Sequence, residues 1–236
     1  MSKPKKNRWN IWFYSDPHFG HGNVINFCNR PFKDVNEMTE KLIEKYNNKV
    51  KENDLTIWVG DCFFYLDNDE RKAIMNRLNG RKVLVRGNHD LKNKQMMNIG
   101  FEISVDEMIY SISNERVLIC HYPFRISRWL HEFYNFRSKI CRKFGIKKFW
   151  SNDLRFYKRR PKNEGQFLIH GHTHDKVKYK NNTDLLSRFL FKLGFKSFRK
   201  RMIHVGVDAW NYEPVSLNKI ANIIDEIKEN EIKSKN

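Results

Sequence analysis

The feature that most constrains this chain is a recurring unit in which a short apolar run ends in metal-binding side chains. The clearest instance is Gly87-Asn88-His89-Asp90, which follows the apolar run 83–85. A β-branched run followed by a tight turn predicts a strand with polar side chains at its carboxyl end. Open α/β sheets keep their functional sites there. Four further units share this organisation: Asp16 and His18 after 11–14, Asp61 after 55–59, His121 after 117–120, and His172 and His174 after 167–169.

The order of the predicted elements favours an α/β fold with two sheets. Early strands alternate with helices at 35–51 and 69–79, whereas 101–105, 108–113 and 117–120 are short strands in succession, which is typical of a second sheet packed on the first. Asp34 with Glu37 predicts the start of the first helix, and Ser216 that of a C-terminal helix. With 236 residues the chain suffices for one sizeable core, so we expect a single domain over 1–236.

The net charge of +18 is concentrated in two segments. Residues 125–162 contain thirteen Lys and Arg against two acidic residues, and 176–201 contain nine against one. Aromatic residues are interleaved with the cations of the first segment, and 185–193 predicts a basic amphipathic helix in the second. We therefore expect basic insertions that form a mostly helical lid at the rim of the site. Cations with aromatics suit single-stranded nucleic acid, and a solvated charged face is the alternative.

The predicted ligands are imidazole, carboxylate and amide groups, which suit divalent ions of intermediate hardness. Mn²⁺ is the first expectation, with Fe²⁺, Zn²⁺ and Ni²⁺ as alternatives. The number of ligands exceeds what one ion needs, whereas two ions about 3.5–4 Å apart that share a carboxylate account for it. Such a pair clamps the oxygens of a displacement at phosphorus. Arg86 and Arg125 are candidate substrate-binding cations that would stabilise transition-state charge.

The order Asp-x-His, Gly-Asp, Gly-Asn-His-Asp, His, Gly-His-x-His resembles the calcineurin-like metallophosphoesterase superfamily, in particular small phosphoesterases of bacteria and their viruses. The resemblance extends from Trp9 to about Pro214 and includes the patterns at 29–34 and 206–212. It implies a four-layer α-β-β-α sandwich of two mixed sheets. It also implies the assignment of ligands: Asp16, His18 and His174 to the first ion, Asn88, His121 and His172 to the second, and Asp61 as the bridge.

The same resemblance implies that a hydroxide held between the ions attacks phosphorus and that His89 protonates the leaving oxygen, with Asp90 as its orienting group. An imidazole that titrates near neutrality suits this step. Asp208 and Trp210, after the last predicted strand, are interpreted as structural or rim residues. His21 is interpreted as a neighbour of the site.

Three functional hypotheses follow. The first is a metal-dependent phosphodiesterase, a nuclease-like hydrolase of nucleic acid or of a phosphorylated nucleotide. The second is a phosphomonoesterase, or a hydrolase of lipid-linked pyrophosphate at a membrane surface that resembles the UDP-diacylglucosamine hydrolases; those carry Arg where this chain has His89. The third is a binding protein without turnover, which the complete ligand set argues against. No apolar segment suits a membrane span or signal peptide, and the cysteines lack Cys-x-x-Cys spacing, so a cytoplasmic location is expected.

Overall fold

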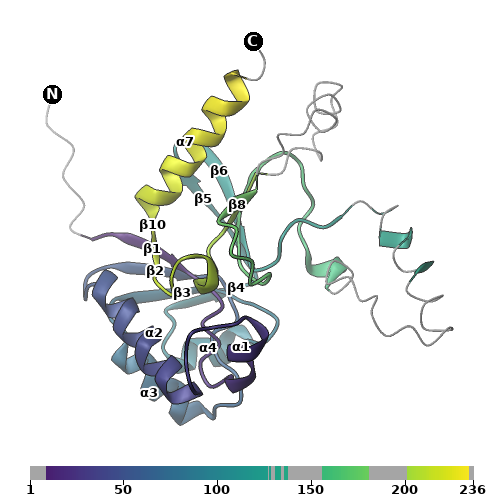
Figure 1. Ribbon diagram of the computed structural model, residues 1–236. Coiled ribbons are helices and arrows are strands. Elements are labelled where there is room, and N and C mark those ends of the chain that lie inside the picture. The colour runs from purple at the N-terminus through teal and green to yellow at the C-terminus, as the bar shows by residue number, and fades with distance from the viewer. Residues whose placement is uncertain are drawn as a thin grey trace, which may run out of the picture.

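The computed structural model describes residues 9–126, 128, 131–133, 136, 137, 156–180 and 201–233 (Figure 1). The elements, in chain order, are β1 (Ile11–Tyr14), α1 (Gly22–Phe27), α2 (Val35–Lys49), β2 (Leu55–Trp58), α3 (Asn68–Arg77), β3 (Arg81–Val85), α4 (Asn93–Ile99), β4 (Ile103–Val105), β5 (Glu107–Ile112), β6 (Glu115–Cys120), η2 (Tyr157–Arg159), β7 (Phe167–His170), β8 (Tyr179–Lys180), β9 (Arg201–His204), η4 (Val207–Ala209), β10 (Val215–Ser216) and α7 (Leu217–Lys233).

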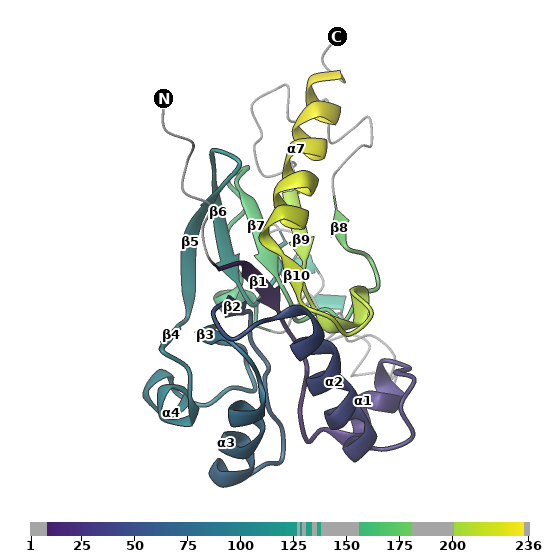
Figure 2. The same ribbon diagram turned by 90° about the vertical axis from the view of Figure 1, so that its left-hand side faces the viewer.

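The strands form two mixed five-stranded sheets (Figure 2). The first has the order β10-β1-β2-β3-β4, in which β1 to β4 are parallel and β10 is antiparallel to β1. The second has the order β5-β6-β7-β9-β8, in which β6, β7 and β9 are parallel. The predicted α/β fold with two mixed sheets is therefore confirmed.

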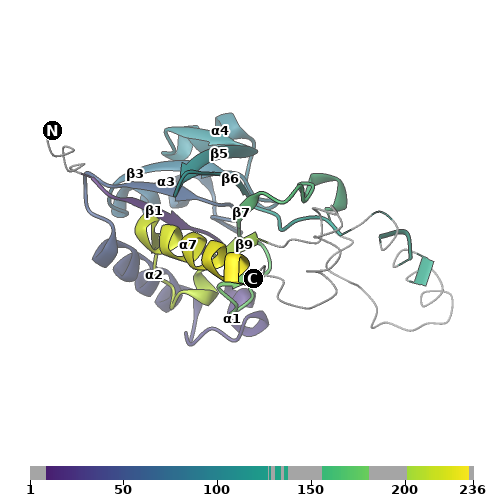
Figure 3. The same cartoon turned by 90° about the horizontal axis from the view of Figure 1, so that it is seen from above.

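Alternation along the strands sends neighbouring side chains to opposite faces, and this builds the layers. Phe13 lies in the apolar cluster between the sheets, whereas Tyr14 lies in the cluster shared with α1 to α4. These helices cover the outer face of the first sheet (Figure 1). Helix α7 lies beside β1, β7 and β9 (Figure 3) and closes the space between the sheets with four buried isoleucines: Ile220, Ile223, Ile224 and Ile227.

The predicted helix starts at Asp34 and Ser216 are confirmed. The Asp34 carboxylate accepts a hydrogen bond of 2.9 Å from the Glu37 backbone N–H, and the Ser216 hydroxyl accepts one of 3.2 Å from that of Lys219. The assignment of 101–105 to the second sheet was wrong. Strand β4 pairs in parallel with β3 in the first sheet, because α4 provides the crossover that a parallel neighbour requires.

The predicted amphipathic helix at 185–193 lies outside the described residues, as does most of the predicted lid at 125–162. The structure describes the two ends of that lid segment, including η2, and only parts of the stretch between them. Among the helices of the described ranges, none has the length and apolar character needed to cross a membrane.

Candidate metal centre

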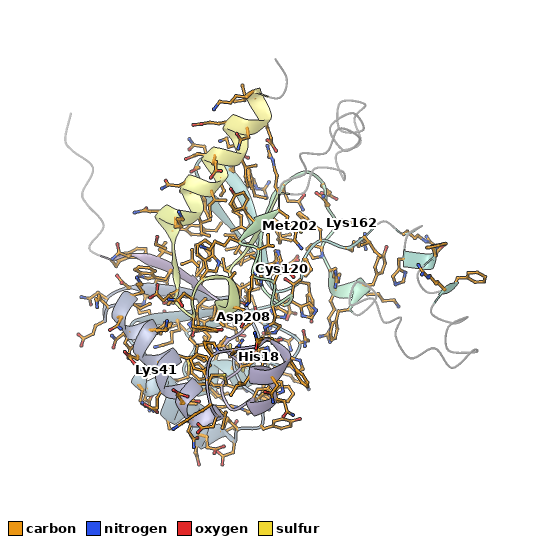
Figure 4. The ribbon with its side chains drawn as sticks, in the orientation of Figure 1. His18, Lys41, Cys120, Lys162, Met202 and Asp208 are labelled. Carbon is orange, nitrogen blue, oxygen red and sulfur yellow. The ribbon has the colours of Figure 1, made fainter. Side chains whose placement is uncertain are left out.

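The site lies where the carboxyl ends of parallel strands from both sheets come together. A parallel bridge between Ser15 and Gly206 joins the end of β1 to the segment after β9, and the Val207 N–H donates to the Ser15 carbonyl at 2.9 Å. The loops after β1, β2 and β3 thereby face those after β6, β7 and β9. His18 and Asp208, which are labelled in Figure 4, come from opposite sheets and lie in this central region.

The backbone of the ligand loops is strained. Positive φ angles occur at five predicted ligands: Asp16 (58°), His18 (52°), Asp61 (54°), His172 (70°) and His174 (50°). For a residue with a Cβ, the left-handed conformation costs roughly 1–2 kcal/mol. Such strained residues are common at functional sites, where the surrounding structure enforces the conformation. The strain therefore indicates that the fold holds these side chains in place against their local preference.

Two groups of potential ligand atoms lie close to the Asp61 carboxylate, which itself belongs to the second group. One consists of Asp16, His18 and His174, and the other of Asp61, His121 and His172; within each group the atoms lie within 4.8 Å of one another. One oxygen of Asp61, Oδ2, lies 3.7 Å from His18 Nε2 and 3.4 Å from His121 Nε2. This carboxylate thus faces both groups, as a bridging ligand must.

Unpaired buried atoms support metal binding. Both ring nitrogens of His18 and the Oδ1 atom of Asn88 are buried without a hydrogen-bond partner in the described structure. Unpaired buried polar atoms are costly and rare. The His121 Nε2 and His172 Nδ1 atoms, by contrast, share a hydrogen bond of 3.2 Å, which places two potential ligand atoms side by side. Divalent cations would satisfy the unpaired atoms of His18 and Asn88 and would bind the His121 and His172 nitrogens in place of their mutual bond, so the residues fit a dinuclear centre.

The ring orientation of two ligands is fixed by their second nitrogen. His121 Nδ1 donates to the Val59 carbonyl at 2.8 Å, and His174 Nδ1 donates to Asp208 Oδ2 at 2.7 Å. Each bond occupies Nδ1, so Nε2 is the nitrogen that would bind a metal; the Nε2 atom of His121 lies 3.4 Å from Asp61 Oδ2. This is the arrangement in which an outer carboxylate or carbonyl sets the tautomer of a metal-binding histidine.

The charges of the site shift the pKa values of its members. Burial alone would raise the pKa of Asp61, but the His121 and His18 charges outweigh it and lower the pKa. Burial alone would lower the pKa of His121, but Asp61 raises it to about 9. Burial would likewise lower the pKa of His174, which its bond to Asp208 raises to about 10. Burial and the His121 charge lower the pKa of His172 to about 3. The pKa values of these neighbouring groups are therefore set mainly by burial and by their charged partners in the site.

Two glycines let the loops approach the ligands. A Cβ atom at Gly87 would lie 2.2 Å from Asp61 Oδ1, and one at Gly171 would lie 2.3 Å from Asp16 Oδ2. Neither distance is compatible with a side chain. The glycines that precede Asn88 and His172 are therefore required by packing against the carboxylates.

His89 and Asp90 follow Asn88 but lie differently. The His89 ring is exposed at the site, 5.6 Å from the His18 ring, and its backbone N–H donates to Asp61 Oδ1 at 2.9 Å. Both oxygens of Asp90 accept backbone N–H groups, at 2.8–2.9 Å, from Asp61, Cys62 and Gly87. These contacts make Asp90 a brace for the bridging loop. It can orient the His89 ring only through that backbone.

The two arginines predicted to bind substrate have other contacts. Arg86 donates to Asp106 Oδ1 at 2.6 and 3.0 Å, and the Arg125 guanidinium stacks over the Tyr157 ring at 5.7 Å. Neither lines the cavity of about 200 Å³ that opens over the ligands. That cavity is lined by His18, His21, Val24, Phe27, Cys28, Asp61, Asn88, His89, Phe156, His172 and His174. The interpretation of His21 as a neighbour of the site agrees with this lining.

Asp208, interpreted from the sequence as a structural or rim residue, pairs with Arg30, whose role the sequence interpretation missed. Arg30 makes two bonds of 2.9 Å to the Asp208 carboxylate and donates to the backbone carbonyls of Asp16 and Pro17 at 2.8 and 2.9 Å. Asp208 in turn accepts from His174. The guanidinium thus connects ligand loops from both sheets. The available signal was that Arg30 and Asp208 fall within the sequence patterns at 29–34 and 206–212.

These features place the chain in a known class. It belongs to the calcineurin-like phosphoesterase family, which matches residues 10–198, and it carries the His/Asp clusters of a metallophosphoesterase. It is 28% identical to uncharacterized protein MJ1445 of Methanocaldococcus jannaschii, over 92% of this chain and 93% of that protein. It is 27% identical to the gene 66 protein of Mycobacterium phage L5, over 94% and 97%. The solved structure of AQ665 of Aquifex aeolicus, a protein of unknown function, is similar with a TM-score of 0.57 and 26% identity, covering 92% of this chain and all of that one.

Proposed function

We propose that this protein is a phosphodiesterase of nucleic acids or nucleotides that works with two divalent ions, Mn²⁺ first among them. The observation that carries the proposal is the Asp61 carboxylate between two ligand clusters, with the exposed His89 ring beside it. A bound pair of ions would activate water and neutralise phosphate charge. A histidine outside both clusters is what cleavage of a poor, alkoxide leaving group additionally requires.

The residues of the chain have separable tasks in this reaction. The hydrogen bond from the His89 backbone to Asp61 fixes the position of the proton donor relative to the bridging carboxylate. The leaving oxygen would then lie near His89 while the phosphorus lies near the ions. His89 would give its proton to the leaving oxygen as the ester bond breaks. Its exposure keeps the ring accessible to water for reprotonation. Asp90 keeps the loop of Asp61 in place through three backbone bonds.

Cations and aromatics adjoin the second ligand cluster and support a nucleic-acid substrate. The Tyr122 and Phe156 rings contact His172 with centroid distances of 5.2 and 5.6 Å. Arg159 donates to the Tyr122 hydroxyl at 3.3 Å, and Lys158 next to it is exposed. Positive charge and ring faces therefore adjoin the cavity at residues 156–159, the described end of the first basic segment. Backbone phosphates and bases would be bound by such a surface.

The reaction is tested with Mn²⁺-loaded protein on bis-p-nitrophenyl phosphate, p-nitrophenyl phosphate, single-stranded DNA, RNA, cyclic nucleotides and a nucleoside-diphospho-lipid. We expect cleavage of diesters in preference to the monoester. The His89→Ala variant should lose about 10²- to 10⁴-fold on an alkyl diester, and less on p-nitrophenyl esters, whose leaving group needs no proton. Turnover of the monoester or the lipid alone would reject the proposal.

The substrate class is tested by charge reversal. Lys158→Glu with Arg159→Glu should weaken oligonucleotide binding. The slope of log affinity against log salt concentration should become shallower by about 0.7 for each single-strand phosphate contact that is lost. Lys41→Glu with Lys72→Glu is the control, since these exposed residues on α2 and α3 carry the same charge change on the outer helical layer. Figure 4 shows Lys41 well separated from His18. Equal behaviour of both double variants would argue against the nucleic-acid path.

A further inference from the structure

Two aromatic side chains beside the cavity are unusually exposed. Phe27 and Tyr65 are each 78% exposed, and no other large hydrophobic side chain in the described ranges is more exposed. Exposing such a ring to water is unfavourable unless something covers it. Phe27 lines the cavity over the ligands, and Tyr65 follows Phe64, which contacts the ring of His89. The exposure is therefore located at the site.

These side chains belong to one array with His21 at its centre. The His21 ring lies 4.2 Å from Phe64, 5.9 Å from Tyr65 and 6.4 Å from Phe27. Phe64 meets Tyr65 edge to face at 4.3 Å and meets His89 at 4.7 Å. The array, defined as Phe27, His21, Phe64 and Tyr65, thus begins at the proposed proton donor and extends outward from the cavity.

The backbone holds the array rigid. Phe19 and Phe63 form a parallel bridge, and the Phe64 N–H donates to the Phe19 carbonyl at 2.8 Å. Gly20 allows this contact, because a Cβ there would lie 2.3 Å from the Phe64 carbonyl oxygen. Tyr65 itself is held at a φ of 55°. A pre-organised surface loses little conformational entropy when a ligand stacks on it.

We infer that the array is a subsite for the base of the leaving nucleoside. The inference rests on the proposed function, because His89 defines the side on which the leaving group departs. The sugar bonded to the leaving oxygen must lie against His89, and its base then lies against the next groups outward, which are Phe64, Tyr65 and Phe27. Planar bases stack on aromatic faces regardless of their sequence. The subsite therefore selects a nucleoside over a plain sugar or alkyl group.

Binding tests the subsite without turnover. The probes are adenosine 5′-monophosphate and ribose 5-phosphate, which carry the same phosphate, titrated into metal-loaded protein by calorimetry. Wild type should prefer the nucleotide by about 5- to 150-fold, the range for stacking one base. Phe27→Ala with Tyr65→Ala should bind both alike at the affinity of the sugar phosphate. Ile109→Ala, 55% exposed on β5, is the control and should keep the preference.

Cleavage separates the subsite from the reaction. The substrates are an intact dinucleotide and the same dinucleotide with an abasic residue on the leaving side. Wild type should cleave the intact one with the higher kcat/KM, by the factor found in binding. The double variant should cleave the two substrates with equal kcat/KM. Equal binding of the two probes by wild type, or an unchanged preference in the double variant, would overturn the subsite. A base preference in binding without cleavage of any diester would keep the subsite and reject the phosphodiesterase. Cleavage of diesters without any base preference would keep the phosphodiesterase and reject the subsite.

Discussion

The buried ion pair between Arg30 and Asp208 should be a main determinant of stability. The two side chains are 0% and 2% exposed and share two bonds of 2.9 Å. Asp208→Ala would leave the guanidinium buried without its counter-ion. Removing one partner of such a pair costs about 3–5 kcal/mol. For a chain of this length we therefore expect Tm to fall by about 6–20 °C.

A surface pair that likewise makes two hydrogen bonds provides the control. Arg77 donates to both oxygens of Glu40, at 2.6 and 2.8 Å, but these side chains are 47% and 60% exposed, so water screens their attraction. Thermal and urea unfolding of Asp208→Ala and Glu40→Ala should be compared in EDTA, so that lost metal binding does not contribute. Glu40→Ala should unfold close to wild type. Equal midpoints for the two variants would refute the reasoning.

Two further predictions concern the metal centre. Gly87→Ala should lose metal affinity, because its Cβ would lie 2.2 Å from Asp61 Oδ1; Gly22→Ala, whose Cβ meets nothing nearer than 4.0 Å, should titrate like wild type, and equal affinities would contradict the packing argument. Metal loading at pH 7 should release protons, because the pKa values of His121 (about 9) and His174 (about 10) keep both rings protonated in the metal-free protein, whereas a metal binds the neutral ring. Affinity should therefore rise with pH up to about 9–10, and binding heats that do not depend on the ionisation enthalpy of the buffer would contradict this.

The strand-then-ligand units could be predicted because each is encoded by consecutive residues. The run 83–85 belongs to a buried strand, and Gly87 and Asn88 follow one residue later, so the position of the ligand loop follows from local sequence. Parallel pairing then brings the units together. The fold class could be predicted for the same reason.

Contacts between distant segments could not be predicted in this way. Arg30 and Asp208 are separated by 178 positions, and neither has a local pattern that indicates a buried partner. Asp90 is next to His89 in the sequence, yet the turn sends its carboxylate to the backbone of Asp61. The sheet that β4 joins is likewise set by its crossover and not by its own three residues.

The central claim is that Asp61 bridges two ions. The most direct measurement is metal content per chain, determined by elemental analysis after equilibration with Mn²⁺ and removal of free metal, for wild type and Asp61→Ala. The account predicts about two ions in wild type and loss of both metal binding and turnover in the variant, because the carboxylate faces both ligand clusters. A variant that keeps a single tightly held ion and unchanged activity would contradict it.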